Sequence, residues 1–243
     1  MPLPDHPPSI VQEANCYPLD AYLASALTGL NSSERDQLFE VSDAVAEVCA
    51  RNGVRLYEPR KVTDPVHHST VPDVEVFRMD RHRVIGSDLL IYLAHHPSTG
   101  AGQEIVFAQE AIVPIVVVAH LTTRLSRMVT GIPGPLHLVR YDSLAELKEQ
   151  LDQVIVELKS TLLQRKKVIQ DLESHHVGTR IRELRIQRGM THQQVTESTR
   201  IPNAFSVGQL KEWEQSSDRL NNLSLTLLRE IAFALRVDVK DLV

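Results

Sequence analysis

One loop of the chain combines the residue types that a catalytic site needs. The nearly continuous apolar run of residues 88–94 predicts a buried strand, and the segment Pro97-Ser-Thr-Gly-Ala-Gly-Gln-Glu104 follows it. Small residues in such a loop let a ligand approach backbone N–H groups, and the start of the next helix favours an anion. The carboxylate of Glu104 could attack an electrophilic carbon held there. Spacing alone favours a simpler interpretation, in which Glu104 complements the helix dipole.

Strand-like and helix-like segments alternate around this loop. The alternation predicts an α/β fold with a five-stranded parallel sheet of the flavodoxin-like kind, covered by helices on both faces. In such a sheet the carboxyl ends of the strands form the ligand crevice, and the Glu104 loop lies at such an end. The expected strands are 22–24, 54–57, 88–94, 114–119 and 136–140, and the expected helices are 33–52, 73–86, 102–112 and 121–129.

The pattern from Pro97 to Ala108 resembles the signature of the nucleoside 2-deoxyribosyltransferase family, whose glutamate attacks the anomeric carbon of a nucleoside. Tyr22, in Ala-Tyr-Leu-Ala-Ser, is similar to the family's first-strand tyrosine. Asp80 is similar to its aspartate for sugar binding and acid–base work. The resemblance implies that Glu104 is the nucleophile, that Asp80 binds the sugar or protonates the leaving base, and that Tyr22 orients Glu104.

Ser98 affects which substrate the resemblance implies. Members that use free nucleosides tend to carry an aspartate at this position, whereas the 2′-deoxynucleoside 5′-monophosphate N-glycosidases carry a serine, as this chain does. Ser98 with the amides of Gly100 and Gly102, and Ser25 in the first-strand loop, could then hold a phosphate. Against this, the loop of residues 25–29 lacks an arginine that would clamp one. Nucleoside, monophosphate and NAD all stay open, as do hydrolysis and transfer to a second base.

Composition excludes several other classes of protein. The chain has 243 residues, a net charge of −5 and two cysteines, which are too few for a disulfide scaffold or a four-cysteine zinc site. It lacks an apolar run long enough to cross a bilayer, and we expect a cytoplasmic protein without a membrane partner. The adjacent histidine pairs 67–68, 95–96 and 175–176 are expected to be solvated loop residues. We expect no metal and no cofactor.

The last 69 residues form a separate pattern of short amphipathic helices. An expected helix over residues 177–188 stops at Gly189, and Thr191 with Gln194 has the spacing of a capping box. The order of motifs resembles the lambda-repressor-like (Xre-type) helix-turn-helix family, with a lengthened turn at residues 203–207. The resemblance implies DNA binding through the exposed side of a recognition helix. The expected contacts are Ser206, Gln209, Lys211 and Glu212.

Two observations leave the role of this segment open. Residues 175–243 contain ten Lys and Arg against eight Asp and Glu, so that the segment is close to neutral. Such folds also serve as protein-interaction or dimerisation units. Trp213, three residues after Leu210, is expected in the core rather than on DNA.

Residues 143–174 are expected to form one helix with an apolar stripe from Leu144 to Leu162. The stripe could be a linker and dimer seam, or it could lie on the helix's own domain. The predicted domains are therefore an extended arm (1–19), a deoxyribosyltransferase-like domain (20–142), a helical linker or dimerisation helix (143–174) and a helix-turn-helix domain (175–243).

The function that these patterns predict is an N-glycosidase for nucleotides or nucleosides, coupled to a DNA-binding domain and assembled as a homodimer or larger. By analogy, such a protein could be a bacterial defence effector. The alternatives are a transcription regulator whose first domain senses a nucleotide without turnover, and an NAD hydrolase.

Overall fold

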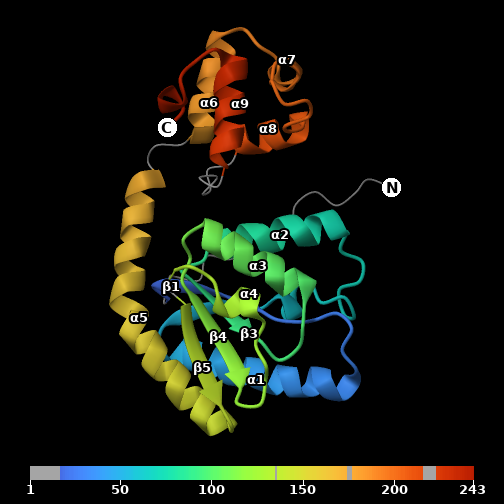
Figure 1. Cartoon of the computed structure of the whole chain (residues 1–243), viewed down its shortest axis with the longest axis vertical. Coiled ribbons are helices and arrows are strands. Elements are labelled where there is room, and N and C mark those ends of the chain that lie inside the picture. Colours follow the sequence, from blue (N-terminus) through green and yellow to red (C-terminus); the bar gives the residue numbers. More distant parts are fainter. Residues whose placement is uncertain (1–16, 135, 174–176, 216–222) are drawn as a thin grey trace.

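A parallel sheet forms the first part of the chain. The structure is a computed structural model, and it describes residues 17–134, 136–173, 177–215 and 223–243 (Figure 1). Most of the predicted extended arm lies outside these residues. Five strands pair in the order β2-β1-β3-β4-β5, all parallel, which is the flavodoxin-like arrangement that the sequence predicts. They are β1 Leu19–Ala24, β2 Val54–Tyr57, β3 Leu89–Leu93, β4 Ile115–His120 and β5 Leu136–Tyr141.

Helices cover both faces of the sheet, which explains why β3 is apolar at every position. Leu89, Ile91 and Leu93 pack into a core with α1 (Ser32–Arg51) and α5 (Leu144–Glu173). Leu90 and Tyr92 face the opposite core, which receives α2 (Asp73–Ile85) and α3 (Thr99–Glu110). Parallel strands that are buried on both faces need apolar side chains in both directions.

The predicted helix at 121–129 is wrong. The helix α4 covers only Arg127–Thr130, and the segment before it is a loop of turns. Arg140 holds this loop, since its guanidinium donates to the carbonyl oxygens of His120 (2.9 Å) and Thr123 (2.6 Å). Ser126 caps the short helix by accepting from the Met128 amide. A side chain from β5 thus satisfies backbone groups that helix formation would otherwise satisfy.

The apolar stripe of α5 packs on the helix's own domain. Leu147, Leu151, Leu158 and Leu162 are buried against α1 and the sheet, so that they offer no free surface to a second subunit. Near its end, α5 places Lys166 within 2.9 Å of the buried carboxylate of Asp88. That carboxylate also accepts from the Asp20 amide, at the amino end of β1.

The remaining helices form a small unit with its own core. This core contains Ile181, Leu184, Val195, Leu210 and Trp213, and the predicted burial of Trp213 agrees. No helix in the described ranges is long and apolar enough to cross a membrane. The elements are α6 Val177–Gln187, α7 His192–Glu197, α8 Val207–Gln215, α9 Leu225–Leu235 and a 3₁₀ turn at Val239–Asp241; a further 3₁₀ turn, Pro59–Lys61, lies in the first domain.

Local features of this unit follow from its residues. Thr191 accepts from the Gln194 amide and Gln194 reaches back to the Thr191 amide, as the capping-box spacing predicts. A Cβ at Gly178 would lie 1.9 Å from the Trp213 carbonyl oxygen, so α6 and α8 approach each other closely only with glycine there. Glu214 is buried and paired with Arg185 at 2.6 Å.

The packing of α5 predicts a difference between two leucines of the same helix. Leu151→Ala should lower the free energy of unfolding by about 2–5 kcal/mol, because it leaves a cavity in the sheet core. Leu163→Ala, at a position that is 40% exposed, should change it by less than about 1 kcal/mol. Urea unfolding measures both values. Equal losses in the two variants would contradict the packing.

Candidate active site

The structure brings Tyr22, Asp80 and Glu104 together from three elements. Tyr22 belongs to β1, Asp80 to α2 and Glu104 to α3. The Tyr22 hydroxyl donates a hydrogen bond to Glu104 Oε1 at 2.7 Å. Asp80 lies close enough to raise the pKa of both partners. Residues that are 58 and 24 positions apart in the sequence therefore share one site.

Backbone architecture fixes the two ends of this hydrogen bond. Tyr22 is fully buried in β1, and its ring stacks on Tyr57 of β2 with ring centroids 5.5 Å apart. Helix α3 begins at Thr99, after Ser98 Oγ accepts from the Ala101 amide. The helix was predicted to start at residue 102, with Glu104 in its first turn. The earlier start places Glu104 in the second turn, where complementing the helix dipole is a weaker explanation for a carboxylate.

Burial raises the pKa of both carboxyl groups. The pKa of Glu104 rises to about 8, chiefly through desolvation; nearby Asp80 adds to the rise and the Tyr22 hydroxyl opposes it. The pKa of Asp80 rises to about 6, again through burial and against the effect of Tyr22. Such shifts are typical of acid–base sites in clefts.

Each carboxyl group keeps one buried oxygen without a partner. Glu104 Oε2 and Asp80 Oδ1 accept no hydrogen bond from the described residues. Buried polar atoms are nearly always hydrogen-bonded, and leaving them unpaired costs about 1–3 kcal/mol each. Each oxygen thus lacks a partner that a bound ligand could supply.

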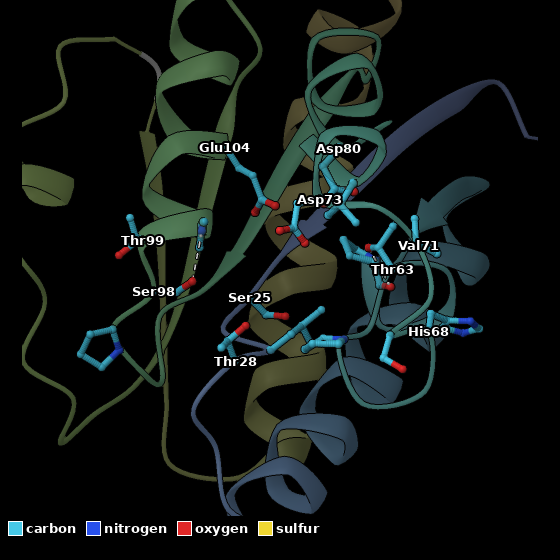
Figure 2. A pocket seen from close by; sticks show the side chains of 18 residues that line it. Ser25, Thr28, Thr63, His68, Val71, Asp73, Asp80, Ser98, Thr99 and Glu104 are labelled. Atoms are coloured by element: carbon cyan, nitrogen blue, oxygen red, sulfur yellow. Dashed lines mark hydrogen bonds between the residues drawn. The ribbon is translucent and has the colours of Figure 1, made fainter. Parts of the chain in front are cut away.

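A cavity of about 640 Å³ opens beside these oxygens (Figure 2). Ligand pockets are typically about 300–1,000 Å³, and this one has room for a nucleoside or a nucleotide. Hydroxyl groups and apolar side chains share the lining. Its residues are Ser25, Leu27, Thr28, Pro59, Thr63, Pro65, His68, Ser69, Val71, Asp73, Val76, Asp80, Pro97, Ser98, Thr99, Gly100, Ala101 and Glu104.

Most of the expected binding residues lie at this cavity. Ser25, Ser98 and Gly100 line it, whereas Tyr22 lies behind Glu104. Gly102 is outside the lining, and its amide donates to the Ser98 carbonyl oxygen at 3.1 Å. The early start of α3 uses that amide inside the helix, and this geometry does not support the phosphate-binding role expected for it.

Sequence reasoning missed Asp73, Tyr57 and His68. Asp73 and His68 line the cavity, and the Tyr57 hydroxyl is buried without a partner among the described residues. Burial raises the pKa of Tyr57 to about 12, and Asp80 adds to the rise. An acidic residue that opens a helix and a tyrosine that ends a strand were the available signals. They are too common to identify a site alone.

Two of the paired histidines, His95 and His68, differ from the expectation that these residues are solvated in loops. His95 Nε2 contacts the Tyr141 hydroxyl, and burial lowers the pKa of this histidine to about 4. His67 is exposed, as expected, while His68 lies at the cavity. The pair 175–176 lies outside the described residues.

The expected DNA-contacting residues lie on α8 and just before it. Ser206 and Gln209 bind each other's backbone, since the Ser206 amide donates to Gln209 Oε1 (2.8 Å) and the Gln209 amide donates to Ser206 Oγ (3.2 Å). This reciprocal pair has the form of a capping box. Lys211 and Glu212 are exposed, and Leu210 is buried in the core.

Comparison with known proteins supports the first-domain resemblance over part of its length. No family model matches the chain. One curated relative, from Syntrophotalea carbinolica, is 34% identical over 87 residues, and its name describes a candidate 2′-deoxynucleoside 5′-phosphate N-hydrolase. The match covers 35% of this chain and 61% of the relative, which is less than two thirds of the relative's length.

Solved structures with related architecture are more distant. The CMP N-glycosidase BcmB of Clostridium botulinum is 16% identical with a TM-score of 0.44. The superposed part is 56% of this chain and 98% of BcmB. The 2-deoxyribosyltransferase of Bacillus psychrosaccharolyticus is 20% identical with a TM-score of 0.41, and 53% of this chain covers 90% of it. At these levels of identity and overlap, neither activity transfers to this chain.

The raised pKa of Glu104 predicts a pH-dependent stability. Between 4.5 and about 8, the folded protein holds a proton on Glu104 that the unfolded chain releases, so the free energy of unfolding should fall as pH rises through this range. Glu104→Gln should remove most of the fall and leave the smaller part due to Asp80. Urea unfolding across the pH range tests this. The control is Glu110→Gln, an exposed position of the same helix, and a curve for Glu104→Gln parallel to the wild type would contradict it.

Proposed function

We propose that the first domain is an N-glycosidase that cleaves the bond between base and sugar in nucleosides or nucleotides. The observation that carries the proposal is the pair of Tyr22 and Glu104 beside Asp80, with unpaired carboxyl oxygens at a cavity of suitable volume. The Syntrophotalea relative supports the same class of reaction.

In the proposed reaction, Glu104 attacks C1′ of the sugar. The C1′–N bond breaks as a C1′–O bond forms, and the departing base takes the electron pair and a proton from Asp80. In the free site Glu104 holds this proton near neutral pH, because its pKa of about 8 lies above that of Asp80 at about 6, so the proton must pass to Asp80 before Glu104 attacks. Tyr22 holds Oε1 of Glu104, which leaves Oε2 for C1′. Water then releases the sugar, or a second base accepts it.

A nucleotide sensor and an NAD hydrolase remain the alternative functions. A sensor without turnover needs neither a held carboxylate nor a nearby proton donor, so the arrangement of Tyr22, Asp80 and Glu104 favours an enzyme. The proposed function and its two alternatives differ in whether a base is released, and in the compound that releases it.

Base release is the direct test. Purified protein should liberate free base from deoxynucleosides or their 5′-monophosphates, as measured by chromatography. Glu104→Gln should lower the rate by about 1,000-fold or more, because it removes the nucleophile. The matched control is Glu110→Gln, which should retain activity. Wild-type protein that binds nucleotides but releases no base would support the sensor, and release of nicotinamide from NAD alone would support the NAD hydrolase.

For the C-terminal unit we propose a helix-turn-helix domain that binds DNA. The supporting observation is the packing of α8, which buries Leu210 and Trp213 and leaves Ser206, Lys211 and Glu212 exposed. A recognition helix must present such an exposed side to the major groove. A homodimer reading two half-sites belongs to this proposal, and light scattering tests for it.

Two substitutions on α8 should affect DNA binding differently. Gln209→Glu keeps the acceptor that caps α8 but loses the amide donors, so it should cost about 1–3 kcal/mol on the specific sequence alone. Lys211→Ala should weaken binding to all sequences and reduce the salt dependence. Gel shifts with the site enriched from genomic DNA measure both effects. If no sequence is enriched and a protein partner is captured instead, the domain is an interaction module.

A further inference from the structure

The charges around the cavity are unbalanced. Its lining contains three carboxyl groups, those of Asp73, Asp80 and Glu104, and includes no lysine or arginine from the described part of the chain. The single basic side chain of the lining is the imidazole of His68. In Figure 2 the labelled Asp73, Asp80 and Glu104 gather in one part of the cavity, and the hydroxyls of Ser25, Thr28 and Ser98 lie in another.

Of the arginines that adjoin the lining, Arg81 follows Asp80 and lies over the Phe107 ring at 5.6 Å from its centroid, and Arg35 and Arg60 are held by ion pairs. Arg35 donates to the Leu27 carbonyl oxygen and forms an ion pair with Asp64 at 2.5 Å. Arg60, next to the lining residue Pro59, pairs with Glu58 and Asp43. Moving either guanidinium to a phosphate would leave buried Asp64 or Glu58 without its cation, and a buried charge without a partner is costly.

The groups that could attract a phosphate are weaker than the carboxylates that repel it. The start of α3 offers the amides of Thr99 and Gly100, and a helix N-terminus acts as about half a positive charge. The Ala101 amide is already bound to Ser98 Oγ, and the Gly102 amide to the Ser98 carbonyl oxygen. A phosphate with nearly two negative charges would face the carboxylate of Asp73 and, above its pKa of about 6, that of Asp80, whereas Glu104 with a pKa of about 8 stays mostly neutral at pH 7.

Asp73 is the carboxylate that the proposed reaction leaves without a role. It opens α2, is exposed, and has no hydrogen bond or ion pair with any described residue. Its carboxylate lies at the cavity, where it can accept a hydrogen bond from a sugar hydroxyl.

We propose that the cavity takes a nucleoside with a free 5′-hydroxyl, and that Asp73 is the specificity-determining residue that rejects the 5′-monophosphate. The inference rests on the proposed N-glycosidase function and narrows its substrate. It differs from the substrate named for the Syntrophotalea relative, whose name specifies a 5′-phosphate.

Glu75 offers a matched control for Asp73. Both are exposed acidic residues in the first turn of α2, where each favours the helix. Glu75 is paired with Arg78 at 3.1 Å and is not part of the cavity lining. If Asp73 only supported the helix, neutralising either residue would have the same effect on substrate choice.

The experiment measures kcat/KM for each deoxynucleoside and its 5′-monophosphate. The wild type should prefer the nucleoside by about 100-fold or more, since placing like charges together strongly disfavours binding. Asp73→Asn should narrow this ratio by about tenfold through improved use of the monophosphate. Glu75→Gln should leave the ratio unchanged. A wild type that prefers the monophosphate, or a ratio that Asp73→Asn does not alter, would overturn the proposal.

Binding of nucleosides and monophosphates to the Glu104→Gln variant tests the substrate preference independently of the proposed glycosidase activity. Calorimetry with the same compound pairs reports selectivity without turnover. Absence of base release from every nucleoside and monophosphate would refute the glycosidase, while tighter binding of nucleosides would still support the rejection of phosphate by the cavity. Equal or tighter binding of monophosphates would overturn it, whether or not base is released.

Discussion

The hydrogen bond between Tyr22 and Glu104 constrains the rest of the first domain. A carboxyl group buried beside a second one needs a donor, and the donor must come from a position that cannot move. Tyr22 meets this need because β1 is a central strand, paired to β2 and β3, and because its ring stacks on Tyr57. The sheet order, the early start of α3 at Ser98 and the placement of α2 all serve to bring one hydroxyl and two carboxyl groups to the same end of the sheet.

The loop between β2 and α2 completes the site, and it is fastened by ion pairs rather than by regular structure. Asp64 accepts from the amides of Val66 and His67 and pairs with Arg35 of α1. Glu58, Arg60 and Asp43 form a second group that joins the loop to α1. These contacts position Thr63, His68 and Asp73, so one wall of the cavity depends on charges that are remote from the reacting atoms.

The sequence predicted the strands and helices whose apolar pattern follows from burial. It missed the segments whose conformation depends on a contact with a single distant side chain. Strand β2 and the start of α2 agree with the expectation, as does the five-stranded parallel sheet of the flavodoxin-like kind. The segment at 121–126 has helical spacing, but Arg140 donates a hydrogen bond to the Thr123 carbonyl oxygen, and no local pattern reveals that contact. Tyr22, Asp80 and Glu104 came from a motif resemblance. Asp73 was missed because its proposed role depends on a cavity lining that contains no lysine or arginine among the described residues, which is a property of the folded cavity.

The ion pair of Lys166 with Asp88 has a consequence for the molecule as a whole. At the amino ends of β1 and β3, the buried Asp88 receives a counter-charge from α5, whereas the carboxyl groups at the opposite ends receive none from the cavity lining. At the amino ends of the strands the buried carboxylate is therefore paired with a cation, whereas at the carboxyl ends the carboxyl groups have no cation in the cavity lining. In the proposed reaction the sugar itself supplies a positive charge, briefly, as its C1′–N bond breaks. The positively charged sugar of the transition state is then stabilised by the site more strongly than the neutral substrate is. Tighter binding of the transition state than of the substrate is what accelerates a reaction.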